Sequence, residues 1–69
     1  MIAAEVELDS EYGRHWEMVK WCNTYIGNQA IWKDNVNRHN PWTVDHRFGN
    51  QIFYFAEEKY ATMFKLRWL

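Results

Sequence analysis

The chain has 69 residues and a formal net charge of −1, and its aromatic residues are five Trp, four Tyr and four Phe. The single cysteine, Cys22, excludes a disulfide within one chain, and the near-neutral charge argues against a protein that holds DNA mainly by neutralising phosphates. A chain this short buries only about 60% of its unfolded surface, so we expect one domain, residues 1–69, whose core depends on aromatic bulk.

The charge is unevenly placed along the chain. Residues 1–12 hold four acids and no base, whereas residues 13–69 hold eight bases and five acids. This asymmetry favours association with a second copy or with a partner of opposite charge. The start, MIAAEVEL, has no basic segment, and no 18-residue apolar run occurs. We therefore expect no signal peptide, no membrane span and a location inside the cell.

Residues 2–9 alternate apolar and polar side chains, which predicts a strand with one buried face. A helix is expected over residues 12–26, with Asp9 or Ser10 as its N-cap and Gly27 directly after its end.

Two apolar stripes run along this expected helix. The first stripe consists of Tyr12, Trp16, Val19, Cys22 and Ile26, and the second of Met18, Trp21 and Tyr25. Together they form an arc wider than one sheet can cover. Either the loop that follows folds over the second stripe, with its tryptophans docked there, or another subunit covers it.

Residues 27–41 contain four Asn and no sustained period, which indicates a loop with a short turn near residues 30–32. A loop of this length is usually functional or mobile. Gly49-Asn50 then predicts a two-residue hairpin turn that pairs Val44 with Phe55.

In this register each face of the hairpin has a distinct character. The face toward the core carries Trp42, Val44, His46, Phe48, Phe53 and Phe55, and the other carries Thr43, Asp45, Arg47, Ile52 and Tyr54. The second set is mostly polar, so we expect that face of the sheet to meet water.

Residues 56–69 place Tyr60, Phe64 and Trp68 on one helical stripe, with acids at the start and bases at the end. The predicted order is βαββα, an α+β two-layer sandwich whose three-stranded sheet carries two helices on one face. This resembles a ferredoxin-like unit without its final strand, which leaves a sheet edge that dimerisation can complete.

The stretch FYFAEEKYATMFKLRWL resembles the C-terminal signature of a family of small, uncharacterised proteins of tailed bacteriophages, cyanophages among them. The matching positions are Phe53, Phe55, Glu57, Glu58, Ala61, Phe64, Lys65, Leu66, Arg67 and Trp68. The resemblance implies a phage accessory protein in the cytoplasm of an infected bacterium, and it implies no activity. Ala56 replaces the family's usual Asn or Asp, which weakens the expected cap of the last helix.

Residues 32–47, WKDNVNRHNPWTVDHR, are the segment that most resembles a site. His39, Asp45 and His46 are metal-ligand types, but Asp45 and His46 are adjacent in a strand and point to opposite faces. His15 and Cys22 share an apolar helix face and are interpreted as core residues. The triplet Val44-Asp45-His46 resembles the start of an HNH nuclease motif, but no histidine follows it. We expect no catalytic residues, no metal and no cofactor.

The function that fits best is protein binding without catalysis, either as a homodimer or on a host protein. Trp21, Trp32 and Trp42 are the expected aromatic anchors, and Arg38 or Arg47 supplies polar contacts. The runner-up is nucleic-acid binding, in which Trp32 and Trp42 stack bases while Lys33, Arg38, His39 and Arg47 contact phosphates. A metal-dependent nuclease is third. Arg67 is a further candidate anchor for a carboxylate or phosphate.

Overall fold

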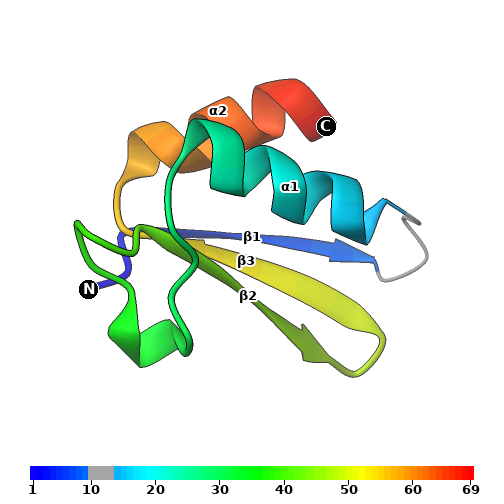
Figure 1. Cartoon of the computed structure of the whole chain (residues 1–69). Helices are drawn as coiled ribbons and strands as arrows, with labels where there is room; N and C mark the ends of the chain where they lie inside the picture. The colour runs from blue at the N-terminus through cyan, green and yellow to red at the C-terminus, as the bar shows by residue number, and fades with distance from the viewer. Residues whose placement is uncertain (10–13) are drawn as a thin grey trace.

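The computed structural model describes residues 1–9 and 14–69. In chain order its elements are β1 (Ala4–Asp9), α1 (His15–Tyr25), the short 3₁₀ helix η2 (Lys33–Asn35), β2 (Trp42–Arg47), β3 (Asn50–Phe55) and α2 (Glu58–Trp68). Both α-helices lie on one face of the sheet and run in opposite directions (Figure 1). The predicted α+β class and βαββα order are confirmed.

The sheet has the order β1-β3-β2, and both neighbouring pairs are antiparallel. This is the arrangement of the ferredoxin-like unit to which the sequence pointed. On the face toward the helices, three cross-strand rows follow one another. The rows are Ala4–Phe55–Trp42, Val6–Phe53–Val44 and Leu8–Gln51–His46. Two rows are apolar and the third is mostly polar, so the core has one polar end.

The main core lies between this face and the helices. Phe64 of α2 packs on Phe53 and Phe55, with ring centroids 4.6 and 5.5 Å away. Trp42 stacks on Phe53, and all four rings are completely buried. Each such side chain contributes about 1.5–3 kcal/mol by leaving water, so aromatic bulk does supply the core.

The predicted hairpin register is wrong by two residues. The turn is Phe48-Gly49, so Arg47 pairs with Asn50 and Val44 with Phe53. Both turn residues have positive φ, +48° and +82°, as a type I′ turn requires. Asn50 instead belongs to β3, where its Nδ2 donates a hydrogen bond to Glu7 Oε2. Because a shift of two residues preserves the alternation, the predicted core residues keep their face of the sheet, but Phe48 is fully exposed, and His46 is also exposed and lies opposite Gln51 instead of Phe53.

Helix α1 begins later than predicted, at His15, with Arg14 at the N-cap and no side-chain cap. Asp9 remains in β1 and therefore is not the cap. The predicted cap Ser10 and the predicted core residue Tyr12 lie outside the described residues.

The buried face of α1 also differs from the prediction. Met18, Cys22 and Ile26, spaced four apart, point into the core, whereas Trp16 is 78% exposed. Cys22, at the centre of this stripe, is completely buried. The second stripe is only partly covered, with Trp21 half-buried and Tyr25 63% exposed.

Helix α2 follows its prediction. Ala61, Phe64 and Trp68 are buried, Tyr60 is half-buried, and no side chain caps the N-terminus. Lys65 and Arg67 lie in the last turn, where cations complement the helix dipole.

The loop over residues 27–41 lies on the sheet face opposite the helices, not on the second stripe of α1 (Figure 1). There Ala30 and Val36 pack with Ile52 and Tyr54 in a second, smaller core. The expectation that this face meets water is therefore wrong for its central residues. The physical reason is that Ile52 and Tyr54 present apolar area that both helices, on the other face, leave uncovered.

Backbone contacts fix the loop in place. Ala30 N donates to Trp42 O at 2.7 Å, and Thr43 Oγ1 donates to Ala30 O at 2.8 Å. The N-terminal ammonium of Met1 donates to Val36 O. The short turn that was expected near residues 30–32 occurs instead as η2.

Candidate functional site

The structure divides the segment 32–47 among three places. Trp42 is completely buried in the main core, and its Nε1 donates to Gly27 O at 2.8 Å, so it is no surface anchor. Arg38 and His39 are exposed on a tight turn in which Asn37 Oδ1 accepts from His39 N and Asn40 N.

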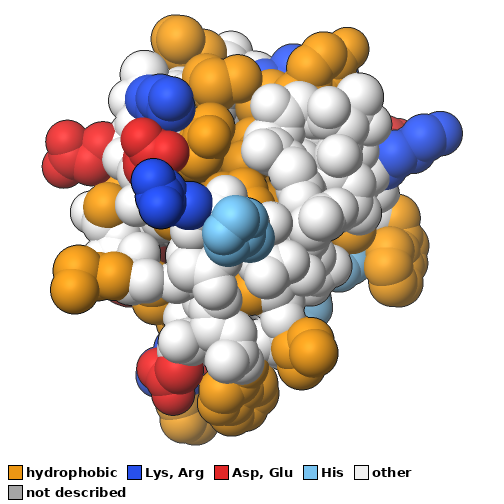
Figure 2. All heavy atoms as spheres, turned by 60° about the vertical axis from the view of Figure 1, so that its left-hand side comes forward, with side chains coloured by type: hydrophobic (Ala, Val, Ile, Leu, Met, Phe, Trp, Pro, Cys, Tyr) orange, Lys and Arg blue, Asp and Glu red, His pale blue; other side chains and the backbone are white. Residues whose placement is uncertain are grey.

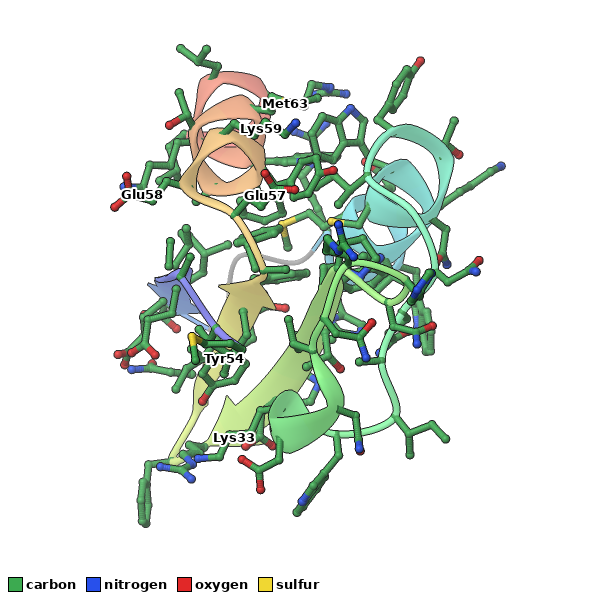
Figure 3. The ribbon with its side chains drawn as sticks, turned by 90° about the vertical axis from the view of Figure 1, so that its left-hand side faces the viewer. Lys33, Tyr54, Glu57, Glu58, Lys59 and Met63 are labelled. Carbon is green, nitrogen blue, oxygen red and sulfur yellow. The ribbon has the colours of Figure 1, made fainter. Side chains whose placement is uncertain are left out.

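Trp32, Lys33 and Arg47 do come together. They line a pocket of about 130 Å³ on the loop side of the sheet, with Ile31, Thr43, Val44 and Asp45. Ile31 is 95% and Trp32 60% exposed. Figure 3 shows Lys33 beside Tyr54 on this outer face, far from Glu57, the N-cap of α2, and from the α2 residues Glu58, Lys59 and Met63. This cluster is named the outer pocket below.

The electrostatics of the outer pocket are mixed. Arg47 Nε lies 3.5 Å from Asp45 Oδ2, and Lys33 Nζ lies 5.9 Å from the Tyr54 ring centroid. Burial raises the pKa of Tyr54, and nearby Glu5 adds to this effect while Arg47 opposes it. Acids of β1 therefore contribute to the field on this face and reduce its attraction for an anion.

A second hollow lies between the two helices and includes Trp21. This helix groove, of about 330 Å³, is lined by Glu17, Lys20, Trp21, Thr24, Tyr25, Arg67 and Trp68. Trp21 packs edge-on against Phe64 at 6.1 Å. The guanidinium of Arg67 lies 4.1 Å from the ring centroid of Trp68, a cation–π contact.

Hydrophobic side chains reach the surface at several separate places in the view of Figure 2, among charged ones of both signs. Leu66 of α2 is 83% exposed and lies between buried Phe64 and Trp68 in sequence, so it points away from the core. Tyr25, which lines the helix groove, is 63% exposed.

Sequence reasoning missed a histidine pair at the polar end of the core. His15 begins α1 and His46 lies near the end of β2, and their ring centroids are 4.8 Å apart. His15 Nδ1 lies 2.8 Å from Oε1 of Gln51, which is directly opposite His46 in the sheet. The hairpin pattern did predict that His46 lies on the face toward the helices. Nothing in the spacing of residues along the sequence, however, places His15 above His46.

The other expected metal ligands do not converge. Asp45 lines the outer pocket while His46 faces the helices, as their adjacency in a strand predicted. Cys22 is completely buried, and burial raises its pKa to about 12. Within residues 1–9 and 14–69, no three His, Cys, Asp or Glu side chains form a metal-binding group.

Comparisons with protein-family models, curated proteins and solved structures give no match. No helix in the described part of the chain is long and apolar enough to cross a membrane. The resemblance to phage proteins therefore stays a prediction from the residues of this chain, and so does any function.

Proposed function

We propose that this protein acts by binding protein, without catalysis, and that its partner is a second copy bound across the two helices. The observation that carries the proposal is the 63% exposure of Tyr25 in a groove that also contains Trp21 and Trp68, together with the 83% exposure of Leu66 on the outer side of α2. A chain this short needs most of its apolar side chains for its own core. Large apolar side chains around a groove indicate a surface that another molecule covers.

Charge supports a second copy as the occupant. The helix groove carries both signs, with Glu17 on one helix and Arg67 on the other, together with Lys20. In a two-fold dimer the same patch faces itself, so Glu17 of one copy can meet Arg67 of the partner. Stacking on Trp68 engages the flat face of the Arg67 guanidinium, and its N–H groups can still bind a carboxylate.

The size of the surface is also adequate. A stable interface takes about 800 Å² from each partner, and the chain exposes 4747 Å² in total. The dimer therefore needs roughly a sixth of the surface, which is about one side of the molecule. An interface of this size with aromatic and Arg residues near its centre has the composition of known binding hot spots.

Sedimentation velocity from micromolar to millimolar concentration tests this proposal. We expect a concentration-dependent shift from the mass of one chain to that of two. A constant monomer mass at the highest concentration would remove the self-association proposal.

The resemblance of residues 53–68 to phage proteins supports a setting for this binding, the cytoplasm of an infected bacterium. In that setting a host protein can occupy the same groove. Affinity capture from infected cells tests this, with Leu66→Glu as the matched bait: a host partner that binds across the two helices is captured by the wild-type chain and lost with the variant.

A second candidate function, single-stranded nucleic-acid binding, is favoured by the outer pocket, where Trp32 lies beside Lys33 and Arg47. An exposed Trp between two cations can stack a base while the cations contact phosphates. A mobility shift with an oligothymidylate at low salt tests it, and Arg47→Ala should abolish the shift. Arg38→Ala is the matched control, since Arg38 lies on the exposed turn and not in the pocket.

A further inference from the structure

We propose that His15 and His46 form a binding site for one divalent transition-metal ion, of the class of Zn²⁺, Ni²⁺ and Cu²⁺ that prefers imidazole. The two rings come from different elements, the first turn of α1 and the end of β2. Their centroids are 4.8 Å apart and their planes are inclined by 52°. The site goes beyond the proposed function, because neither histidine lines the helix groove.

The ring separation fits two ligands of one ion. A metal-to-nitrogen distance of about 2.0–2.1 Å, with the ring centroid about 1.1 Å behind the nitrogen, places two centroids roughly 4.5–5.2 Å apart for angles of about 90–109°. The observed 4.8 Å lies inside this range. The separation of the two rings is therefore that of two imidazoles bound to one ion.

Gln51 prepares His15 for this role. Its side chain is completely enclosed, with 1% exposure, and its Oε1 lies 2.8 Å from His15 Nδ1. An amide oxygen only accepts hydrogen bonds, so in the tautomer that donates from Nδ1 to this oxygen, Nε2 carries the lone pair that a metal needs. A hydrogen bond from the second nitrogen to a carbonyl-type oxygen is the usual support of a metal-binding histidine.

The position of Gln51 argues against simple packing. Its neighbours in β3 on the same face are Phe53 and Phe55, and an apolar side chain here would need no partner. A buried amide costs free energy unless it is hydrogen-bonded, and His15 meets its oxygen. The sheet thus carries a polar residue in its core that holds one imidazole beside another.

Among the described residues, no third His, Cys, Asp or Glu joins the two histidines, so within residues 1–9 and 14–69 the site has two protein ligands. Such an open, two-histidine site binds more weakly than a structural zinc site. Among the three ions, Cu²⁺ should bind most tightly, in accordance with the usual order for nitrogen ligands.

Calorimetric titration of the full chain with Zn²⁺ alone, and then with Cu²⁺ alone, tests the site. We expect one ion per chain, at least tenfold tighter Cu²⁺ binding than Zn²⁺, and at least tenfold weaker binding of both ions by His46→Gln. His39→Gln is the matched control, since it removes the remaining histidine, which lies on the exposed 37–40 turn. It should bind as the wild-type chain does, as should Leu66→Glu, whose substitution lies on the exposed side of α2.

Nitrogen-15 NMR measures the chemical shifts of the histidine ring nitrogens, which a purely structural role of the pair would leave unchanged on addition of metal. Zn²⁺ should shift the resonance of His15 Nε2 and leave Nδ1 protonated. Circular dichroism establishes that each variant is folded. No saturable binding by the wild-type chain, unchanged binding by folded His46→Gln, or equal loss in His39→Gln would each overturn the site. A stoichiometry of one ion per two chains would also contradict a site formed within one chain.

Discussion

The indole Nε1 of Trp42 donates a hydrogen bond of 2.8 Å to the carbonyl oxygen of Gly27, and this bond joins the first residue of β2 to the residue that follows the C-cap of α1. It fixes the point where the long loop leaves the helix layer. The Trp42 ring at the same time stacks on Phe53 in the core. One side chain thus positions the helix, the loop and the sheet relative to one another.

Trp42→Phe should lower the free energy of unfolding by about 2–3 kcal/mol, because the smaller ring leaves a cavity and the Gly27 carbonyl loses its donor. Urea denaturation followed by circular dichroism measures this. Trp32→Phe is the matched control: Trp32 is 60% exposed, so its change should stay within about 0.5 kcal/mol. Equal losses in both variants would contradict the assigned positions of the two tryptophans.

Gly27 should tolerate no side chain. Its φ is +142°, and an added Cβ would lie 3.0 Å from Pro41 Cγ. We expect Gly27→Ala to destabilise the fold by about 1–3 kcal/mol. Adding Pro41→Ala to this variant relieves the contact but not the backbone strain, so it should recover only part of the loss. Full recovery of the free energy of unfolding would show that the contact with Pro41, and not the backbone strain, causes the whole loss.

Phe48 should be replaceable with a gain in stability. It is fully exposed and has a φ of +48°, a conformation that costs a bulky residue about 1–2 kcal/mol. Phe48→Asn creates an Asn-Gly type I′ turn and should raise the free energy of unfolding by about 0.5–1 kcal/mol. A decrease measured by thermal or urea denaturation would mean that the Phe48 ring packs on the fold.

Cys22 should react with thiol reagents only after unfolding, and it should make stability depend on alkaline pH. Burial raises its pKa from 9.0 to about 12. The folded chain therefore keeps the neutral thiol, and the resulting stability is complete below pH 9 and is lost as the pH rises from 9 toward 12. By one unit above pH 9 the loss is about 1.4 kcal/mol.

The comparison that isolates this effect is the difference between the wild-type chain and Cys22→Ala, measured by urea denaturation at mildly and strongly alkaline pH. Tyr54, whose pKa burial also raises, is common to both chains and cancels. A difference that does not change with pH would contradict the buried neutral thiol.

Local patterns predicted the elements well, and tertiary partners decided the rest. Strand alternation and the Tyr60, Phe64, Trp68 spacing depend on neighbours in sequence, and both are confirmed. The hairpin register was wrong because Gly49 can occupy either turn position, and cross-strand contacts of Asn50 select one. Trp16 was misplaced because a wide apolar arc does not show which part of it meets the sheet.

The candidate sites show the same limit. The pattern of residues 32–47 brought Trp32, Lys33 and Arg47 to attention, and the structure places them around one pocket. It could not show that Trp42 turns into the core or that the loop crosses to the other face of the sheet. His15 and His46 are far apart in the chain, and only the packing of α1 on the sheet brings them together.

The most direct test of the central claim, self-association across the two helices, compares two variants by sedimentation velocity. Leu66→Glu and Ile31→Glu place the same charge at residues that are 83% and 95% exposed, the first on α2 and the second at the outer pocket. Leu66→Glu should weaken the dimer at least tenfold, and Ile31→Glu should leave the dimer unchanged. A dimer that persists in Leu66→Glu, or that is lost in Ile31→Glu alone, would contradict the account.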